Sequence, residues 1–124
     1  MREVKTIGDE LNGLGMTIKQ IMDQNLNSPR TWKKINKLKG SLIVREADTG
    51  VAITILFNKG EFKIQNDAIE SPSAYLEAGF DALADISSGA VGPIRALLTG
   101  RIKARGNLLK LLMVSHVLIT REES

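Results

Sequence analysis

Residues 97–119 constrain the fold of this chain more than any other segment, because a two-faced strand pattern is followed there by an apolar helix pattern. In the strand pattern, Arg101, Lys103 and Arg105 alternate with Ile102 and Ala104. A period of two puts the basic residues on one face of a strand and the small apolar residues on the other. An apolar surface must therefore lie against the face of the strand that carries Ile102 and Ala104.

The helix predicted after this strand has almost no polar face. Gly106 breaks the strand, and Asn107 is suited to the N-cap position. From residue 108 to residue 118 only Lys110, Ser115 and His116 are polar. Because a surface helix normally shows a single apolar stripe, this helix is either buried on most of its sides or in contact with an apolar ligand.

Length and composition favour one small domain with an aliphatic core. The chain has 124 residues, of which 43% are hydrophobic and only 4% aromatic, and its net charge is +3. We expect a single domain over residues 1–124, with helices in residues 1–40 and the sheet and remaining helices in residues 41–119. Cysteine is absent, which fits a reducing compartment, and neither a signal peptide nor a membrane span is evident. A cytoplasmic location is therefore expected.

Few residues of the chain could carry catalysis. His116 is the only histidine, which excludes a histidine metal cluster, and the absence of cysteine excludes a thiolate nucleophile. Asp81 and Asp85 are four residues apart, but such pairs are usually solvated surface charges. We therefore predict no catalytic residue, no metal site and no cofactor, and we expect that the protein is not an enzyme.

The first third of the chain has a helical apolar pattern. Ile7, Leu11, Leu14, Ile18 and Ile21 have a spacing that aligns them on one side of a helix. The glycines within this segment weaken the helix prediction. The apolar side packs either on the core of the same chain or on a second copy, so the sequence leaves monomer and homodimer open.

A cationic helix is predicted to start at Ser28 and Pro29, which suit the N-cap and the first helical position. One stripe carries Trp32, Ile35 and Leu38. The other face carries the cations Arg30, Lys33, Lys34 and Lys37. A solvated surface is the ordinary interpretation of this face. Alternatively, this face would hold phosphates or lie on an anionic membrane. Together with Arg101, Lys103 and Arg105 it would hold an anionic head group if both rows lined one opening.

The middle of the chain predicts a three-stranded antiparallel meander over residues 41–47, 51–58 and 61–65, with short glycine-containing turns between the strands. Ser71 and Pro72 are then expected to open a helix that carries Leu76, Phe80, Leu83 and Ser87 on one side. A short helix starts at Pro93. Strands clustered together with helices around them indicate an α+β domain, with helices on one face of a mainly antiparallel sheet.

Three segments resemble the sterol carrier protein type 2 family of sterol-binding and lipid-transfer domains. They are VAITILFNKGEFKI, SPSAYLEAGFDALADISSG and GPIRALLTGRIKARGN, and the likeness extends over about residues 41–119. The resemblance implies an antiparallel sheet of about five strands whose helices enclose an apolar tunnel. Only four strands are evident in the sequence, so the fifth is either a short segment around Ala68 and Ile69 or absent.

A lipid tunnel needs aliphatic walls without buried charge, because each buried CH₂ group of a ligand contributes about 0.8 kcal/mol. For every candidate lining residue, ordinary core packing is the alternative interpretation. The candidates are Ile55, Phe57, Phe62, Phe80, Leu97, Leu108, Leu111, Leu112 and Met113. The charged tail of residues 120–124 is not expected to cover an apolar opening.

The leading functional hypothesis is a small carrier that holds a sterol-like, fatty-acid, fatty acyl-CoA or phospholipid ligand without covalent chemistry. One alternative is an interaction module whose cationic helix docks an acidic partner or nucleic acid, although no specific nucleic acid is expected. Another is an accessory subunit of an acyl-CoA enzyme. Strong salt dependence without lipid binding would favour the interaction module.

Overall fold

The computed structural model describes residues 2–8 and 10–119, which form one mixed sheet and five helices. In chain order the elements are β1 (Lys5–Thr6), α1 (Gly13–Leu26), α2 (Pro29–Ile35), β2 (Lys39–Glu46), β3 (Ala52–Asn58), β4 (Glu61–Asn66), β5 (Ala74–Ala78), α3 (Phe80–Ser88), α4 (Pro93–Leu98), β6 (Ile102–Gly106) and α5 (Leu108–Leu118). The strand order across the sheet is β1-β4-β3-β2-β5-β6. The α+β class is confirmed, with six described strands rather than about five.

Strands β2, β3 and β4 form the antiparallel meander that the sequence predicts. In its register Ile55 lies opposite Leu42 on one side and Ile64 on the other, and Phe57 lies opposite Phe62. The two phenylalanine rings stack with centroids 6.1 Å apart. This apolar face is the centre of the core.

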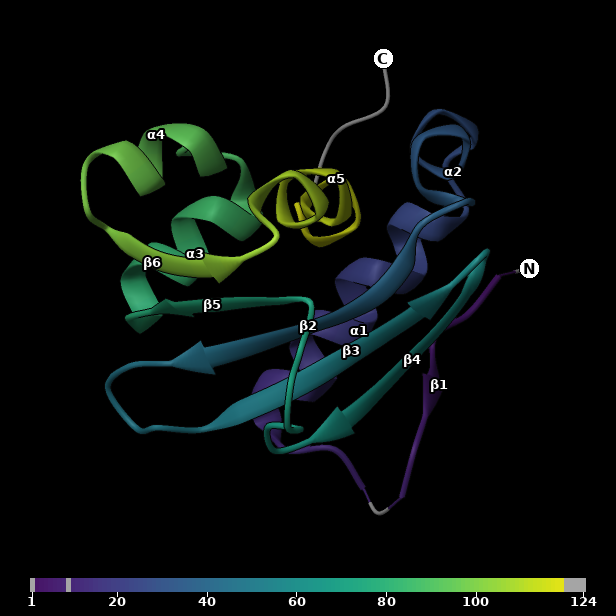
Figure 1. Cartoon of the computed structure of the whole chain (residues 1–124), viewed down its shortest axis with the longest axis horizontal. Coiled ribbons are helices and arrows are strands. Elements are labelled where there is room, and N and C mark those ends of the chain that lie inside the picture. The colour runs from purple at the N-terminus through teal and green to yellow at the C-terminus, as the bar shows by residue number, and fades with distance from the viewer. Residues whose placement is uncertain (1, 9, 120–124) are drawn as a thin grey trace.

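The sheet is covered differently on its two faces. Figure 1 shows α1 behind the sheet and the connection from β4 to β5 crossing in front of it. On the front face Thr54 is fully buried, donates from Oγ1 to the carbonyl of Asp67 at 2.7 Å and accepts from the amide of Ile69 at 3.2 Å. The connection is thereby fixed to the front face of the sheet. The helices pack on the opposite face, and the core lies between them and the sheet.

The helix expected from Ser71 is wrong over its first half, because residues Ala74–Ala78 form β5. This strand lies parallel to β2 and antiparallel to β6. Ser73 and Ser41 exchange two hydrogen bonds of 3.1 Å, in which each amide donates to the other hydroxyl, and these bonds hold the start of β5 beside β2. The fifth strand is therefore at residues 74–78 and not around Ala68 and Ile69, and the helix α3 starts only at Phe80.

The first helix also begins later than its apolar pattern indicates. Asn12 is its N-cap and accepts a hydrogen bond from the amide of Gly15 at 2.8 Å. Ile7 and Leu11 precede the helix, and the short strand β1 pairs in parallel with β4. Within the helix, Met22 and Leu26 are buried in the core of the same chain.

The second helix begins where the sequence predicts, since Ser28 is the N-cap of α2 and Pro29 is its first residue.

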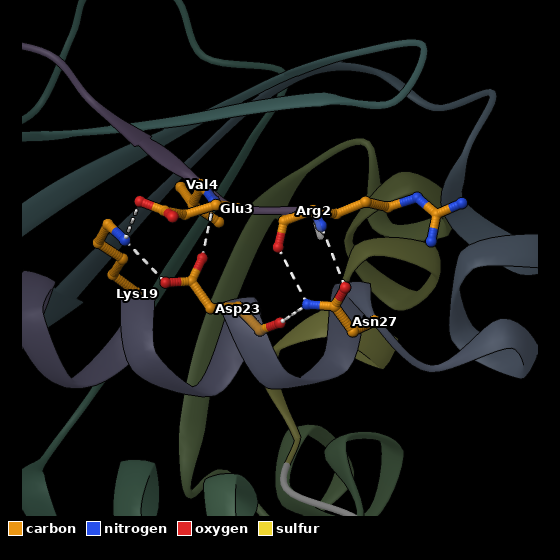
Figure 2. Close-up of polar contacts among 6 residues, drawn as sticks. All are labelled: Arg2, Glu3, Val4, Lys19, Asp23 and Asn27. Carbon is orange, nitrogen blue, oxygen red and sulfur yellow. Dashed lines mark hydrogen bonds and ion pairs between the residues drawn. The ribbon is translucent and has the colours of Figure 1, made fainter.

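The N-terminal segment is attached to α1 by polar contacts (Figure 2). Lys19 forms ion pairs with Asp23 at 2.7 Å and with Glu3 at 3.4 Å. Asp23 also accepts a hydrogen bond from the amide of Val4 at 2.7 Å, and Asn27 bonds both the amide and the carbonyl of Arg2. Val4 in this segment is completely buried and belongs to the hydrophobic core.

Candidate functional site

An apolar cavity of about 230 Å³ lies between the β5 and β6 end of the sheet and the helices α3, α4 and α5. Val44, Leu76 and Ile102 form its floor, because the alternation of each strand turns these side chains toward the helices. The period-two prediction for β6 is confirmed, since Ile102 is buried whereas Arg101, Lys103 and Arg105 are exposed.

The lining of this cavity is almost entirely aliphatic. Its members are Ile18, Val44, Leu76, Leu83, Ile86, Ser87, Pro93, Ile94, Leu97, Leu98, Ile102, Leu108, Leu111, Leu112, Ser115, Leu118 and Ile119. The only polar side chains among them are two serines, and the Ser115 hydroxyl donates to the carbonyl of Leu112 at 2.6 Å. No charged side chain is present in this lining, so the cavity can bind hydrocarbon without displacing a solvated ion.

A second hollow of about 410 Å³ adjoins the cavity between α1 and α3. The two spaces share Ile18, Leu83 and Ser87. At its far end stands Glu46, which is buried and accepts from the amide and hydroxyl of Thr49 at 2.6 and 2.9 Å. Together the two spaces reach the size of ordinary ligand pockets, which enclose roughly 300–1,000 Å³.

The nine predicted lining residues fall into four groups. Leu97, Leu108, Leu111 and Leu112 line the cavity, and Phe80 lines the second hollow. The three candidates of the meander lie in the filled core instead and line neither space; they are Ile55, Phe57 and Phe62. Met113 is half-buried on α5 and is also absent from both linings.

The floor and the α3 wall were missed by sequence reasoning. Val44 and Leu76 belong to parallel neighbours, and this pairing is long-range in the sequence. Leu83 belongs to the apolar side expected for that helix but was not among the predicted lining residues, and Ile86 lay outside the expected apolar side. A further usable signal lies in residues 94–98, where Ile94 and Leu98 have helical spacing beside Leu97.

The two cationic rows do not meet at one opening. Figure 1 shows α2 and β6 on opposite sides of α5. The cations near α2, which are Arg30, Lys33, Lys34 and Lys37, are exposed. Arg101, which directly precedes β6, pairs with Asp85 at 2.8 Å, and on β6 the guanidinium of Arg105 lies 4.6 Å from the ring centre of Tyr75. A single phosphate site built from both rows is therefore excluded.

Within residues 2–8 and 10–119, no group of three or more His, Asp or Glu side chains is arranged to hold a metal ion. His116 is half-buried on α5, and Asp85 is engaged by Arg101. No helix in this part of the chain combines the length and apolarity needed to cross a membrane.

An α+β domain with an aliphatic cavity between its sheet and its helices is the class that this geometry defines. The model of the SCP-2 sterol transfer family matches residues 18–118, and the chain belongs to this family. No protein of curated function matches the chain by sequence.

Solved structures share the fold at low sequence identity. The sterol carrier protein domain 2 of Helicoverpa armigera is 23% identical with a TM-score of 0.61, over 94% of this chain and 99% of that one. A UbiJ-SCP2 ubiquinone synthesis protein is 10% identical with a TM-score of 0.65, over 86% and 90% of the two chains. The sec-alkylsulfatase Pisa1 from Pseudomonas sp. is 15% identical with a TM-score of 0.73, over 90% of this chain but only 17% of the enzyme.

Proposed function

We propose that this protein is a non-covalent lipid carrier that holds an acyl chain or a sterol-like ligand in the cavity under α3, α4 and α5. The observation that carries the proposal is the lining, which is aliphatic apart from two serines and contains no charged side chain. Membership of the SCP-2 sterol transfer family supports the same role. The ligand would be selected by length and apolarity rather than by a set of polar contacts.

The polar groups around the two spaces suggest how a ligand would be oriented. Glu46 at the end of the second hollow disfavours a carboxylate or phosphate there, because two like charges in a partly desolvated site repel each other. An anionic head group would therefore lie at the α4 end of the cavity, where Arg95 is cationic. The protein contributes binding and no catalysis in this proposal, and it acts in the cytoplasm.

Native mass spectrometry of gently purified protein tests this proposal. A near-stoichiometric lipid that survives purification and is identified after denaturing extraction would support it, and the same spectrum would report monomer or dimer. Displacement of a fluorescent fatty acid gives an independent measurement. Protein that carries no lipid and fails to bind the fluorescent fatty acid would contradict the carrier role.

A second candidate is an accessory subunit that presents a lipid to an enzyme. The structural neighbours include a ubiquinone synthesis protein and a domain-sized part of a sec-alkylsulfatase, so the same fold occurs as one part of an enzyme. Because their sequence identity is low, these neighbours support the fold alone, and the role of an accessory subunit is a proposal for this chain. Co-purification of a defined enzyme with the lipid-loaded protein, lost on delipidation, would favour this candidate over a free carrier.

A further inference from the structure

Glu46 occupies a position on β2 where the strand pattern predicts an apolar side chain. Leu42, Val44 and Glu46 alternate along the strand, so all three belong to the face of the sheet that the helices cover. Leu42 and Val44 are 0% and 2% exposed, and Glu46 is only 7% exposed. Because a charged side chain at a buried position is costly unless it has a partner, the partners of this carboxylate decide its role.

One oxygen of the Glu46 carboxylate is engaged and the other is not. Oε2 accepts two hydrogen bonds from Thr49, one from the amide at 2.6 Å and one from the hydroxyl at 2.9 Å, and both lie within the turn between β2 and β3. Among the described residues, Oε1 has no hydrogen-bond partner, and no Lys or Arg forms an ion pair with Glu46. The turn therefore uses one half of the carboxylate and leaves the other half available.

The second hollow offers a ligand group access to this carboxylate. Glu46 is the only charged side chain among the described residues that line the hollow. The other polar side chains of the lining are uncharged, and they are Asn12, Thr17, Thr49 and Ser87. The hollow shares part of its wall with the apolar cavity. A ligand whose apolar body lies in the cavity can therefore place a polar end beside Glu46.

We propose that Glu46 is a specificity-determining residue that selects ligands whose polar end donates a hydrogen bond. The ligand class is a long-chain alcohol or amine, whose hydroxyl or ammonium group donates to Oε1 in the second hollow. This inference rests on the proposed carrier function. A fatty-acid carboxylate has no proton to donate and is repelled beside Glu46. With its head group at the α4 end instead, a fatty acid would leave Oε1 without a partner.

The competing interpretation is that Glu46 only shapes the turn between β2 and β3. Short polar side chains such as Asn, Asp and Ser commonly close such turns. A turn needs no second carboxylate oxygen, and burial of an unpaired acceptor carries a cost that turn formation does not explain. The two interpretations differ in one measurable quantity, since a turn residue would have no influence on which head group the protein prefers.

Ligands of equal chain length test the proposal on the original chain. Decan-1-ol, decylammonium and decanoate are compared by displacement of the neutral fluorescent probe diphenylhexatriene. Both donors should bind about tenfold more tightly than decanoate, and the tighter of the two identifies the preferred head group. Equal affinities for all three would overturn the selectivity and leave the carrier function intact. Failure of the probe and of all three ligands to bind would overturn both.

The Glu46→Gln variant tests the residue itself. Glutamine keeps one oxygen for Thr49 and replaces Oε1 with an amide nitrogen, which donates instead of accepting. The preference for decylammonium over decanoate should therefore fall about tenfold or reverse, while the probe still binds. An unchanged preference in this variant would overturn the proposal. Because the ligand series on the original chain needs no variant, the proposal remains testable even if Glu46→Gln does not fold.

Glu77→Gln is the matched control. It removes the same charge from the neighbouring strand β5, where Leu76 lines the cavity and alternation places Glu77 on the opposite face of the sheet. Its preference between decylammonium and decanoate should stay within about twofold of the original chain. A change as large as that of Glu46→Gln would mean that net charge, rather than the position of Glu46, sets the preference, and would overturn the proposal.

Discussion

The two halves of the inner sheet face contain similar aliphatic side chains, yet one half is filled and the other is hollow. Ile53, Ile55 and Ile64 on the β3 and β4 side are fully buried against α1 and its neighbours. Val44, Leu76 and Ile102 on the β2, β5 and β6 side form the floor of a cavity. Composition therefore does not decide where this protein is hollow, and the placement of the helices does.

The helices differ in length and in how closely they approach the sheet. On the filled side α1 has 14 residues and packs on both β3 and β4. A Cβ atom at Gly15 would lie only 3.2 Å from Ile53 Cγ2, so the missing side chain allows the close approach. On the hollow side α3 and α4 have 9 and 6 residues, and α3 packs on α4. These short helices cover the sheet without filling the space beneath them.

Truncation of the filled half should have the largest effect on stability. Ile55→Ala removes a fully buried side chain from well-packed surroundings and should lower the free energy of unfolding by about 3 kcal/mol. Leu97→Ala on the cavity wall should cost no more than about 1.5 kcal/mol, because its surroundings already contain free space. Urea denaturation measures the free energy of unfolding of both variants. Equal losses would show that the two halves are packed alike.

The close approach of α1 is tested at its two glycines. Gly15→Val should destabilise the protein by about 2 kcal/mol, because Ile53 and Leu11 would have to move. Gly13→Ala is the control, since nothing lies within 4 Å of its Cβ position, and it should change stability by less than about 1 kcal/mol. The same denaturation experiment separates them, and a neutral Gly15→Val would refute the steric argument.

Filling the hollow half should change binding more than stability. Leu112→Trp places a larger ring on the cavity wall and should lower the affinity for a fluorescent fatty acid about tenfold, which corresponds to about 1.4 kcal/mol. The denaturation midpoint should decrease only slightly, because free space is available for the ring. Unchanged affinity in a folded variant would place the ligand elsewhere.

The smallest effect is expected at the attachment of the N-terminal segment to α1. The hydrogen bond to Asp23 raises the pKa of Lys19 above its ordinary value of 10.5, with the charges of Asp23 and Glu3 acting in the same direction. A raised lysine pKa stabilises the folded state below the ordinary value, and this contribution is lost as pH rises through the raised pKa. Lys19→Met should therefore cost about 0.5 kcal/mol at neutral pH.

Denaturation of both proteins at a series of pH values checks this prediction. The difference between the original chain and Lys19→Met should be constant from neutral pH to about pH 10 and then shrink. A difference that persists at pH values above the raised pKa of Lys19 would mean that the aliphatic part of Lys19, rather than its charge, makes the contribution.

Elements defined by local signals were predicted well. Ser28, Pro29, Pro93 and Asn107 begin helices as expected, since capping and proline geometry depend on neighbouring residues. The antiparallel meander was predicted from alternation and short turns, and the structure confirms it. Residues 74–78 were misassigned because Leu76 suits a helical stripe as well as a strand, and only pairing with β2 and β6 decides between them.

By itself, the sequence determined an α+β domain, the two-faced strand β6 and the apolar character of α5, because periodicity and capping act within a few residues. The tertiary structure alone decided that Ile55, Phe57 and Phe62 are core whereas Leu97, Leu108, Leu111 and Leu112 face a cavity. It also separated the two cationic rows on opposite sides of α5. Aliphatic side chains have the same sequence pattern whether they contact other protein atoms or face empty space. Only the distance between helix and sheet therefore distinguishes a filled core from a cavity.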